Sequence, residues 1–419
     1  MQQLKKATLK ASKAVYGVLD QGVLSAGTFL LAVVIARTST VEEFGAYGVI
    51  FTIFTLLITV YRSMFVMPYL LESGAAGEGA PSHSLRQGMI STSFVAAVVL
   101  FCIGAVSAAI VPGQLGIALL GLAIAAPILL FQDCLRYVVL HENGIRRVLV
   151  VDTVWVGSQA CGQAIAVASG NASLFVQLVI WGATGGISLI AVPLITWARP
   201  TARVVLSFTR RALVHGKNLV LEAVMTSGSQ YLSILALSSV AGLVLIAEVR
   251  ASQLLLGPLV VVSQGLLTSL LPGIIKIGSG DVRRLKRICL AFGAGLFIFV
   301  VSFAGLLHLV PASVGSQFLG QSWASAFTLL WPLALAQAFG GLALGATLGY
   351  RGLGLSKETS VIRTLVFPLT PIAMFAGYAL FDGRGAAFGL ALASGITAAI
   401  LWSHFLVIYS RRRNHNPAT

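Results

Sequence analysis

Several ionisable residues stand inside long apolar stretches of this sequence, where a charged group is costly to keep. They are Asp20, Arg62, Asp133, Arg136, Asp152 and Glu222. Ionisable groups at membrane depth commonly bind a substrate or an ion, or conduct protons. Arg62 is the most deeply placed of them, so we expect it to line a polar cavity. The most plausible partner for Arg62 is Asp20, from the preceding stretch.

Structural explanations exist for the same residues. Asp133 and Arg136 are three positions apart and could neutralise each other on one helix face. Asp152 and Glu222 stand where helices are expected to begin, and the helix dipole favours a carboxylate there. Arg62 could instead extend its guanidinium toward the lipid headgroups. The sequence leaves these explanations open beside a binding role.

The stretches that must position these residues have the length of membrane spans. The chain has 419 residues, of which 57% are hydrophobic and only 10% charged, and its mean hydropathy is +0.92. A soluble domain typically has about 25% charged residues. A helix crosses the bilayer core with about 20 apolar residues, and the stretches lack the alternation of barrel strands. We therefore predict an all-α polytopic membrane protein.

Twelve spans are predicted, in two lobes of six. The first lobe contains residues 15–37, 45–70, 88–111, 115–140, 148–169 and 173–197. The second lobe contains residues 219–242, 250–275, 288–311, 323–349, 359–381 and 385–409. A basic connector joins them, so the predicted domains are 1–197, 198–218 and 219–419. Two lobes with an even number of spans share one orientation, which predicts a parallel pseudo-two-fold repeat around a central cavity.

Lys and Arg mark the connections between the predicted spans. The net charge is +15, but the cations are distributed along the chain, so we do not expect nucleic acid as a partner. All but four of the 28 Lys and Arg residues fall on one side of the predicted membrane. The four exceptions are Arg37, Arg62, Arg250 and Arg384. Because cytoplasmic loops carry the positive charge, both termini are predicted to be cytoplasmic.

The predicted connections have little room for catalysis. The outward-facing connections at 112–114 and 170–172 are very short, and no phosphate-binding loop of the form G-x-x-x-x-G-K-[ST] is present. We therefore expect a transporter and not an enzyme, without a metal or organic cofactor. Glutamines at membrane depth could bind sugars in a polar cavity. They are Gln21, Gln132, Gln230, Gln253 and Gln264.

The first predicted pair of spans contains a familiar pattern. It reads GVLDQGVLSAGTFLLAVVIARTSTVEEFGAYGVIFTIFTLL, with an apolar span that ends in Ala36-Arg37 and a loop that reads EEFGAY at 42–47. Over about residues 17–70 the chain resembles the first hairpin of Wzx-type polysaccharide flippases. That family is grouped with MurJ-type lipid II flippases and MATE exporters. Elsewhere the resemblance consists of the twelve-span layout and the basic middle segment.

The resemblance implies a flippase in the bacterial inner membrane. Its substrate would be an undecaprenyl-diphosphate-linked oligosaccharide for O-antigen (lipopolysaccharide) or exopolysaccharide synthesis, moved by rocking of the two lobes. The diphosphate is anionic, and arginine binds phosphate in a bidentate manner. Arg62 would therefore bind the headgroup, assisted by Arg136 or by Arg37 and Arg250. Asp20 would hold Arg62 in place or carry a coupling proton or sodium ion.

The complete set of candidate binding residues joins these charges to their polar neighbours. It comprises Arg62, Asp20, Gln21, Arg37, Arg136, Asp133, Gln230, Arg250, Gln253 and Gln264. Expected partners are the lipid-linked substrate, membrane lipids and, as a further expectation, a polysaccharide polymerase or other assembly proteins.

Two other functions are compatible with the sequence. One is a MATE-like, ion-coupled exporter of small organic cations, which would need a carboxylate deep in the cavity. The carboxylates here lie near the predicted cytoplasmic ends of the spans. The other is a membrane enzyme of envelope glycan assembly, which would need acidic, His or Arg groups beside an outer groove. His308, Asp382 and Arg384 are few for that purpose.

Overall fold

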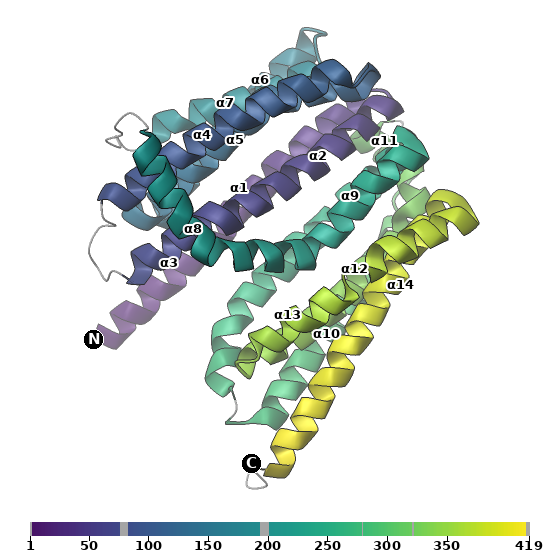
Figure 1. The fold of residues 1–419 in the computed structure, drawn as a ribbon. Helices are drawn as coiled ribbons and strands as arrows, with labels where there is room; N and C mark the ends of the chain where they lie inside the picture. Colours follow the sequence, from purple (N-terminus) through teal and green to yellow (C-terminus); the bar gives the residue numbers. More distant parts are fainter. Residues whose placement is uncertain (1, 76–82, 193–200, 279, 321, 416–419) are drawn as a thin grey trace. The chain divides into compact units, whose positions relative to one another are not determined.

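The computed structural model describes residues 2–75, 83–192, 201–278, 280–320 and 322–415, and these residues are helical almost throughout (Figure 1). The chain divides into two compact units, Met1–Val224 and Met225–Thr419. The division falls after the predicted connector 198–218. A helix that occupies most of this connector packs within the first unit.

The first unit is built around one central helix, α5, which packs on α2, α4, α6 and α7. The helices of this unit are α1 (Gln2–Thr38), α2 (Val41–Tyr61), η1 (Arg62–Val66), α3 (Met67–Ala75), α4 (His83–Ile110), α5 (Gly113–Asn143), α6 (Ile145–Ala168), α7 (Leu174–Ser188), η2 (Leu189–Ala191) and α8 (Ala202–Ala223). Helix α1 packs mainly on α6. The two helices of the N-terminal hairpin therefore pack on different partners, α1 on α6 and α2 on α5.

The turn between α1 and α2 is held by a capping box. The side chain of Thr40 accepts a hydrogen bond from the backbone N–H of Glu43, and the Glu43 carboxylate accepts one from the N–H of Thr40. This reciprocal pair satisfies two donors at the start of α2. The conspicuous EEFGAY segment thus begins α2, and Glu43 has a structural function there.

Helices α2 and α3 are joined through a π-helical turn, η1, that begins at Arg62. Pro68 has no N–H to donate to the carbonyl of Met64, four residues earlier, and its ring would clash with that carbonyl in a regular α-helix. The backbone widens instead, and the N–H of Met67 donates to the carbonyl of Arg62. Turns of this kind occur frequently at functional sites.

The second unit contains two helical runs that are too long for one crossing. Its elements are α9 (Ser229–Ile277), α10 (Val282–Leu307), α11 (Ala312–Leu319), α12 (Ser322–Gly352), α13 (Ser356–Val366) and α14 (Leu369–His415), and η3 (Val224–Gly228) connects α8 to α9. The 49 residues of α9 would extend about 74 Å. The run breaks at Gly242, whose φ of 80° and ψ of 175° are not helical.

Helix α14 turns back on itself at Phe381 and Asp382. A Cβ atom placed on Gly377 would lie 2.1 Å from the carbonyl oxygen of Gly385, and one on Gly389 would lie 2.1 Å from that of Ala373. Contacts in which one residue number rises as the other falls define an antiparallel hairpin. The two halves of α14 therefore lie side by side with their backbones touching.

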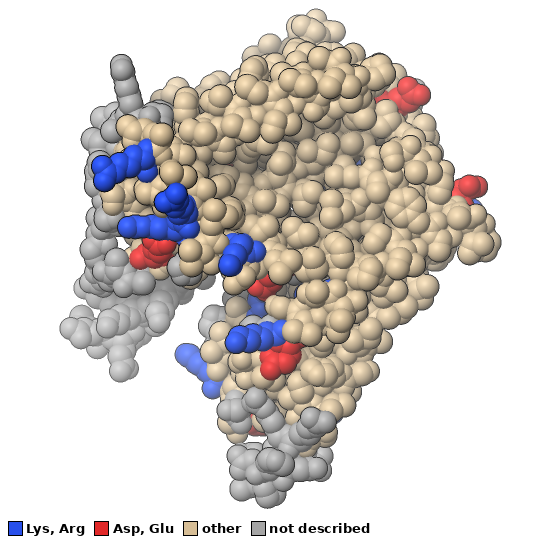
Figure 2. All heavy atoms as spheres, in the orientation of Figure 1, with Lys and Arg blue, Asp and Glu red and all other residues tan. Residues whose placement is uncertain are grey.

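These breaks reconcile the structure with the predicted spans. Among the described residues, ten helical runs are long and apolar enough to cross a membrane. Two of them, Ser229–Ile277 and Lys357–Ser410, contain the breaks and account for two crossings each. The prediction of an all-α polytopic membrane protein is confirmed, with twelve crossing segments in two six-helix lobes. On the face drawn in Figure 2, uncharged residues cover most of the described surface and the charged residues stand apart from one another or in small groups.

Candidate functional site

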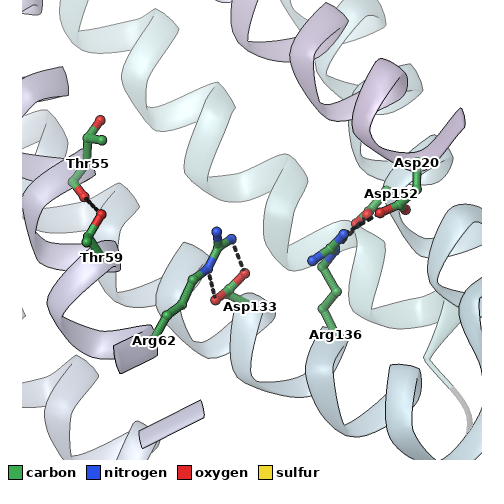
Figure 3. A network of polar contacts seen from close by, with 7 residues as sticks. All are labelled: Asp20, Thr55, Thr59, Arg62, Asp133, Arg136 and Asp152. Carbon is green, nitrogen blue, oxygen red and sulfur yellow. Dashed lines mark hydrogen bonds and ion pairs between the residues drawn. The ribbon is translucent and has the colours of Figure 1, made fainter. Parts of the chain in front are cut away.

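The first unit contains a bidentate ion pair between Arg62, at the end of α2, and Asp133 on α5. The Nε and Nη2 atoms of Arg62 donate to the two carboxylate oxygens of Asp133 at 2.9 and 2.7 Å (Figure 3). The Asp133 side chain is 4% exposed, whereas that of Arg62 is 35% exposed. The carboxylate is thus buried, and part of the guanidinium remains accessible.

A second, fully buried cluster joins three helices at Arg136 of α5. Its Nη2 atom donates to Asp20 of α1 at 2.5 Å, and its Nε atom donates to Asp152 of α6 at 2.7 Å (Figure 3). The three side chains are between 0% and 6% exposed. Because a buried charge without its partner is strongly unfavourable, these residues fix the relative positions of α1, α5 and α6.

Tyr137 connects the two clusters. The guanidinium carbons of Arg62 and Arg136 each lie 5.5 Å from the centre of its ring. Both distances are within the range of cation–π attraction. The half-buried ring therefore contacts one partly exposed and one buried guanidinium.

Helix geometry explains why α5 serves both clusters. Asp133 and Arg136 are three residues apart, so their side chains point about 60° apart around the helix. Helix α5 packs on α2 on one side and on α6 on another. Asp133 meets Arg62, the first residue after α2, and Arg136 meets Asp152 of α6 together with Asp20, because α1 packs on α6.

The charges of the two clusters do not balance. Three carboxylates face two guanidinium groups, which leaves one excess negative charge if all five are ionised. The Oδ1 atoms of Asp20 and Asp152 are buried and accept no hydrogen bond from a described residue. A buried, unpaired carboxylate oxygen is costly. A proton or one monovalent cation between these two carboxyl groups would neutralise the excess.

Three sequence expectations about these residues were wrong. Arg62 pairs with Asp133 and not with Asp20, which lies on the α6-facing side of α1. Asp133 and Arg136 bond to other helices and do not neutralise each other. Asp152 does not begin a helix, since α6 starts at Ile145 and Asp152 is buried about two turns later.

Glu222 also does not begin a helix. It is the penultimate residue of α8, which continues through η3 into α9. The expected favourable interaction with a helix N-terminus is therefore absent at this described residue, and its side chain is exposed. Helix α8 begins further upstream, at Ala202, and the next candidate span begins downstream, at Ser229.

The remaining candidates lie outside the two clusters. Gln21 follows Asp20 on α1 but is exposed. Arg37, also exposed, is in the last turn of α1, about 25 Å from Asp20 along the helix axis. The other four lie on α9 in the second unit. They are the half-buried Gln230, Arg250 and Gln253 and the exposed Gln264.

Three contributors escaped the sequence analysis. Tyr137 follows Arg136 and lies one turn after Asp133, and this position on a charged helix face could have indicated that its ring contacts the charged groups. Thr55 and Thr59 share the α2 face of Arg62, at spacings of four and three residues (Figure 3). Both hydroxyls are half-buried and donate to the carbonyl four residues earlier. Among the described residues, no group of three or more His, Cys, Asp or Glu could hold a metal ion.

The helices and their order define a fold shared by multi-pass membrane transporters and lipid flippases. No protein-family model matches the chain, and no curated protein sequence matches it. Several solved structures, however, match its fold. The inward-facing structure of a multidrug resistance MATE family transporter of the MOP superfamily aligns with a TM-score of 0.65 and 11% identity, covering 95% of this chain and 99% of that one.

The lipid II flippase MurJ, in an inward closed conformation, aligns with a TM-score of 0.67 and 12% identity, covering 95% of this chain and 90% of that one. An outward-facing MATE structure gives a TM-score of 0.62 at 12% identity, with 96% and 95% covered. At these identities the likeness establishes the fold. Because this fold carries both drug exporters and a lipid flippase, the choice of substrate depends on the residues of this chain.

Proposed function

We propose that this protein is a flippase that moves an undecaprenyl-diphosphate-linked oligosaccharide across a bacterial inner membrane for polysaccharide synthesis. The observation that carries the proposal is the partly exposed guanidinium of Arg62, held from behind by the buried carboxylate of Asp133. A guanidinium has five N–H donors, and Asp133 accepts from two of them. The others can bind the oxygens of a diphosphate.

The surroundings of Arg62 suit a headgroup that is both anionic and polar. Thr55 and Thr59 extend the polar face of α2 beside Arg62 (Figure 3). Each hydroxyl donates to a backbone carbonyl, so its oxygen remains able to accept a hydrogen bond from a sugar hydroxyl. The polyprenyl tail would stay in the lipid while the headgroup crosses beside this face.

The buried Arg136 cluster supports ion coupling. A proton or a sodium ion shared by Asp20 and Asp152 would remove the excess negative charge. Both carboxylates anchor helices, so binding and release of this ion would alter how firmly α1 and α6 are held to α5. We propose that this change in helix packing switches the protein between its inward-open and outward-open states.

One observation favours a second candidate, a MATE-like exporter of small organic cations. The two clusters carry one more carboxylate than guanidinium, and a cation binds where negative charge exceeds positive. Against this candidate, the accessible charge is that of Arg62, whereas the three carboxylates are buried. A cationic drug would meet the arginine first.

Reconstitution in liposomes tests both candidates. Purified protein is incorporated with a fluorescent undecaprenyl-diphosphate oligosaccharide, and a membrane-impermeant quencher reports how much label has reached the other leaflet. We expect transfer by the wild type and by the control Arg86→Ala, which removes an arginine paired with Glu142 outside the clusters. Arg62→Ala is expected to abolish it. Uptake of a fluorescent organic cation without transfer of the lipid would overturn the flippase proposal.

A further inference from the structure

Helix α8 presents three different stripes along its length. Phe208, Ala212 and Gly216, four residues apart, form the buried stripe. Phe208 stacks on Phe65 of η1 with ring centroids 6.5 Å apart. A Cβ atom on Gly216 would lie 2.6 Å from the carbonyl oxygen of Met64. This stripe fixes α8 directly against the backbone of the π-turn that begins at Arg62.

The other two stripes repeat every seven residues, so each runs nearly parallel to the helix axis. One is apolar and consists of Leu206, Leu213 and Val220, of which Leu206 is 53% and Leu213 42% exposed. The second is cationic and consists of the exposed Arg203, Arg210 and Lys217. Residues of the two stripes that are three positions apart point about 60° apart. The stripes therefore run side by side along the open part of α8.

This pairing of stripes is typical of a helix that lies in the membrane surface. Such a helix buries its apolar stripe at the boundary of the acyl chains and keeps its cations at the level of the headgroups. Unlike the helices around it, α8 lacks the apolar composition of a span, and it is not among the ten candidate spans. Within the described part of the chain none of the three cations forms an ion pair, so their charge is available to a partner.

We propose that α8 is an interfacial helix that binds anionic phospholipid, with Arg203, Arg210 and Lys217 as the headgroup site. Anionic lipids of the cytoplasmic leaflet attract basic segments next to a membrane, and the positive-inside distribution predicts α8 on that side. The neighbouring apolar stripe would contact the acyl chains of the same lipids. A free anion in solution has no acyl chain and would leave the apolar stripe without a contact.

The position of α8 gives this lipid contact a route to the candidate site. Arg62 is two residues from Met64, whose carbonyl faces Gly216 without an intervening side chain. Lipid that holds α8 in the interface would therefore also hold the π-turn in place. This step depends on the proposed role of Arg62, whereas lipid binding by α8 does not.

Native mass spectrometry of the purified full-length protein tests the binding site. Phosphatidylglycerol and phosphatidylcholine are titrated separately, and retained lipids are counted. The triple variant R203Q/R210Q/K217Q is compared with R283Q/R284Q/R287Q, which removes three exposed arginines from the start of α10. We expect the α8 variant to bind phosphatidylglycerol on the order of tenfold more weakly and the α10 variant to bind as the wild type. Equal losses would overturn the proposal.

A depth measurement tests the same proposal without removing a charge. Spin labels are placed at Leu213→Cys, on the apolar stripe, and at Asn218→Cys, exposed on another side of α8, after replacement of the four native cysteines. We expect the label at 213 to be accessible to oxygen in the lipid and the label at 218 to a water-soluble relaxing agent. Equal access of the aqueous agent to both would contradict an interfacial helix. Displacement of phosphatidylglycerol by undecaprenyl diphosphate would assign the cations to the substrate instead.

Discussion

Asp133 holds Arg62 through two hydrogen bonds, and the two residues differ greatly in exposure, with 4% for the carboxylate and 35% for the guanidinium. The carboxylate thus orients a cation that remains partly accessible. This arrangement distinguishes Arg62 from Arg136, whose side chain is only 6% exposed and donates to Asp20 and Asp152 inside a buried cluster. It makes Arg62 the residue on which binding of an anionic headgroup can be tested.

Replacement of Arg62 by lysine keeps the charge but removes the forked donor geometry. We expect Arg62→Lys to slow transfer of the lipid-linked oligosaccharide on the order of 10- to 100-fold, because charge-assisted hydrogen bonds are lost. The transfer rate in liposomes measures this effect, with Arg86→Lys as the matched control. Transfer at the wild-type rate by Arg62→Lys would show that only the charge matters.

Removal of Arg136 should destabilise the first unit strongly. Arg136→Gln leaves Asp20 and Asp152 as buried carboxylates without a cation, at a cost of about 3 to 5 kcal/mol. Asp152→Asn should cost much less, because it also removes the excess negative charge. Thermal unfolding of the purified variants compares the two. A smaller loss for Arg136→Gln than for Asp152→Asn would refute the charge balance proposed for this cluster.

The excess charge also predicts a dependence on protons or sodium. Protonation of one buried carboxyl group removes its unpaired charge, so the stability of the wild type should rise as the pH falls, or with added sodium if that ion binds. Asp20→Asn and Asp152→Asn should each weaken the dependence, since the neutral amide needs no ion. Unfolding temperatures across pH and sodium concentration measure it. If both variants keep the wild-type dependence of the unfolding temperature on pH and sodium, the proposal that an ion binds in this cluster is wrong.

Gly242 and Gly265 on α9 provide a matched pair for the break in that helix. Gly242 has a φ of 80° and a ψ of 175°, whereas Gly265 is helical, and neither has a neighbouring atom where a Cβ would lie. Gly242→Ala should destabilise by about 1 to 3 kcal/mol, because this backbone conformation is open essentially to glycine alone. Gly265→Ala should be neutral or stabilising, since alanine favours the helix. Unfolding of the two variants in the same detergent tests this difference.

The predicted orientation can be tested with single cysteines in a background without native ones. Asn171→Cys lies in the short turn between α6 and α7, and Asn218→Cys lies on the exposed surface of α8. In intact cells, a membrane-impermeant maleimide should label position 171 and not position 218. The opposite labelling would invert the topology and place α8 on the outer surface.

The spans could be predicted because each is a long apolar segment, but ion-pair partners could not. Depth along the sequence placed Arg62 and Asp20 in the same half of the membrane, and this made them look like a pair. Which side chains meet depends on how each helix is rotated and which helix it packs on. That α5 would lie centrally, with Asp133 toward α2 and Arg136 toward α6, is a property of the packed bundle. The hydrophobic periodicity of each helix, taken by itself, does not indicate this arrangement.

Local backbone features were predictable only in part. A proline such as Pro68 interrupts the regular hydrogen bonding of a helix, yet the sequence does not indicate that the chain widens here into the π-turn Arg62–Val66. The connector 198–218 was recognised as basic, whereas its three-stripe helix requires a count of positions in steps of four and seven.

The glycines of α14 have a consequence for how the chain enters the membrane. Gly377, Gly385 and Gly389 allow the two halves of this helix to touch along their backbones, so each half covers polar backbone that the other would expose to lipid. The last two spans should therefore insert during synthesis as one closed hairpin. A chain that stalls after the first half should remain mobile at the translocon until the second half emerges, and bulky substitutions at Gly385 should prolong that stage.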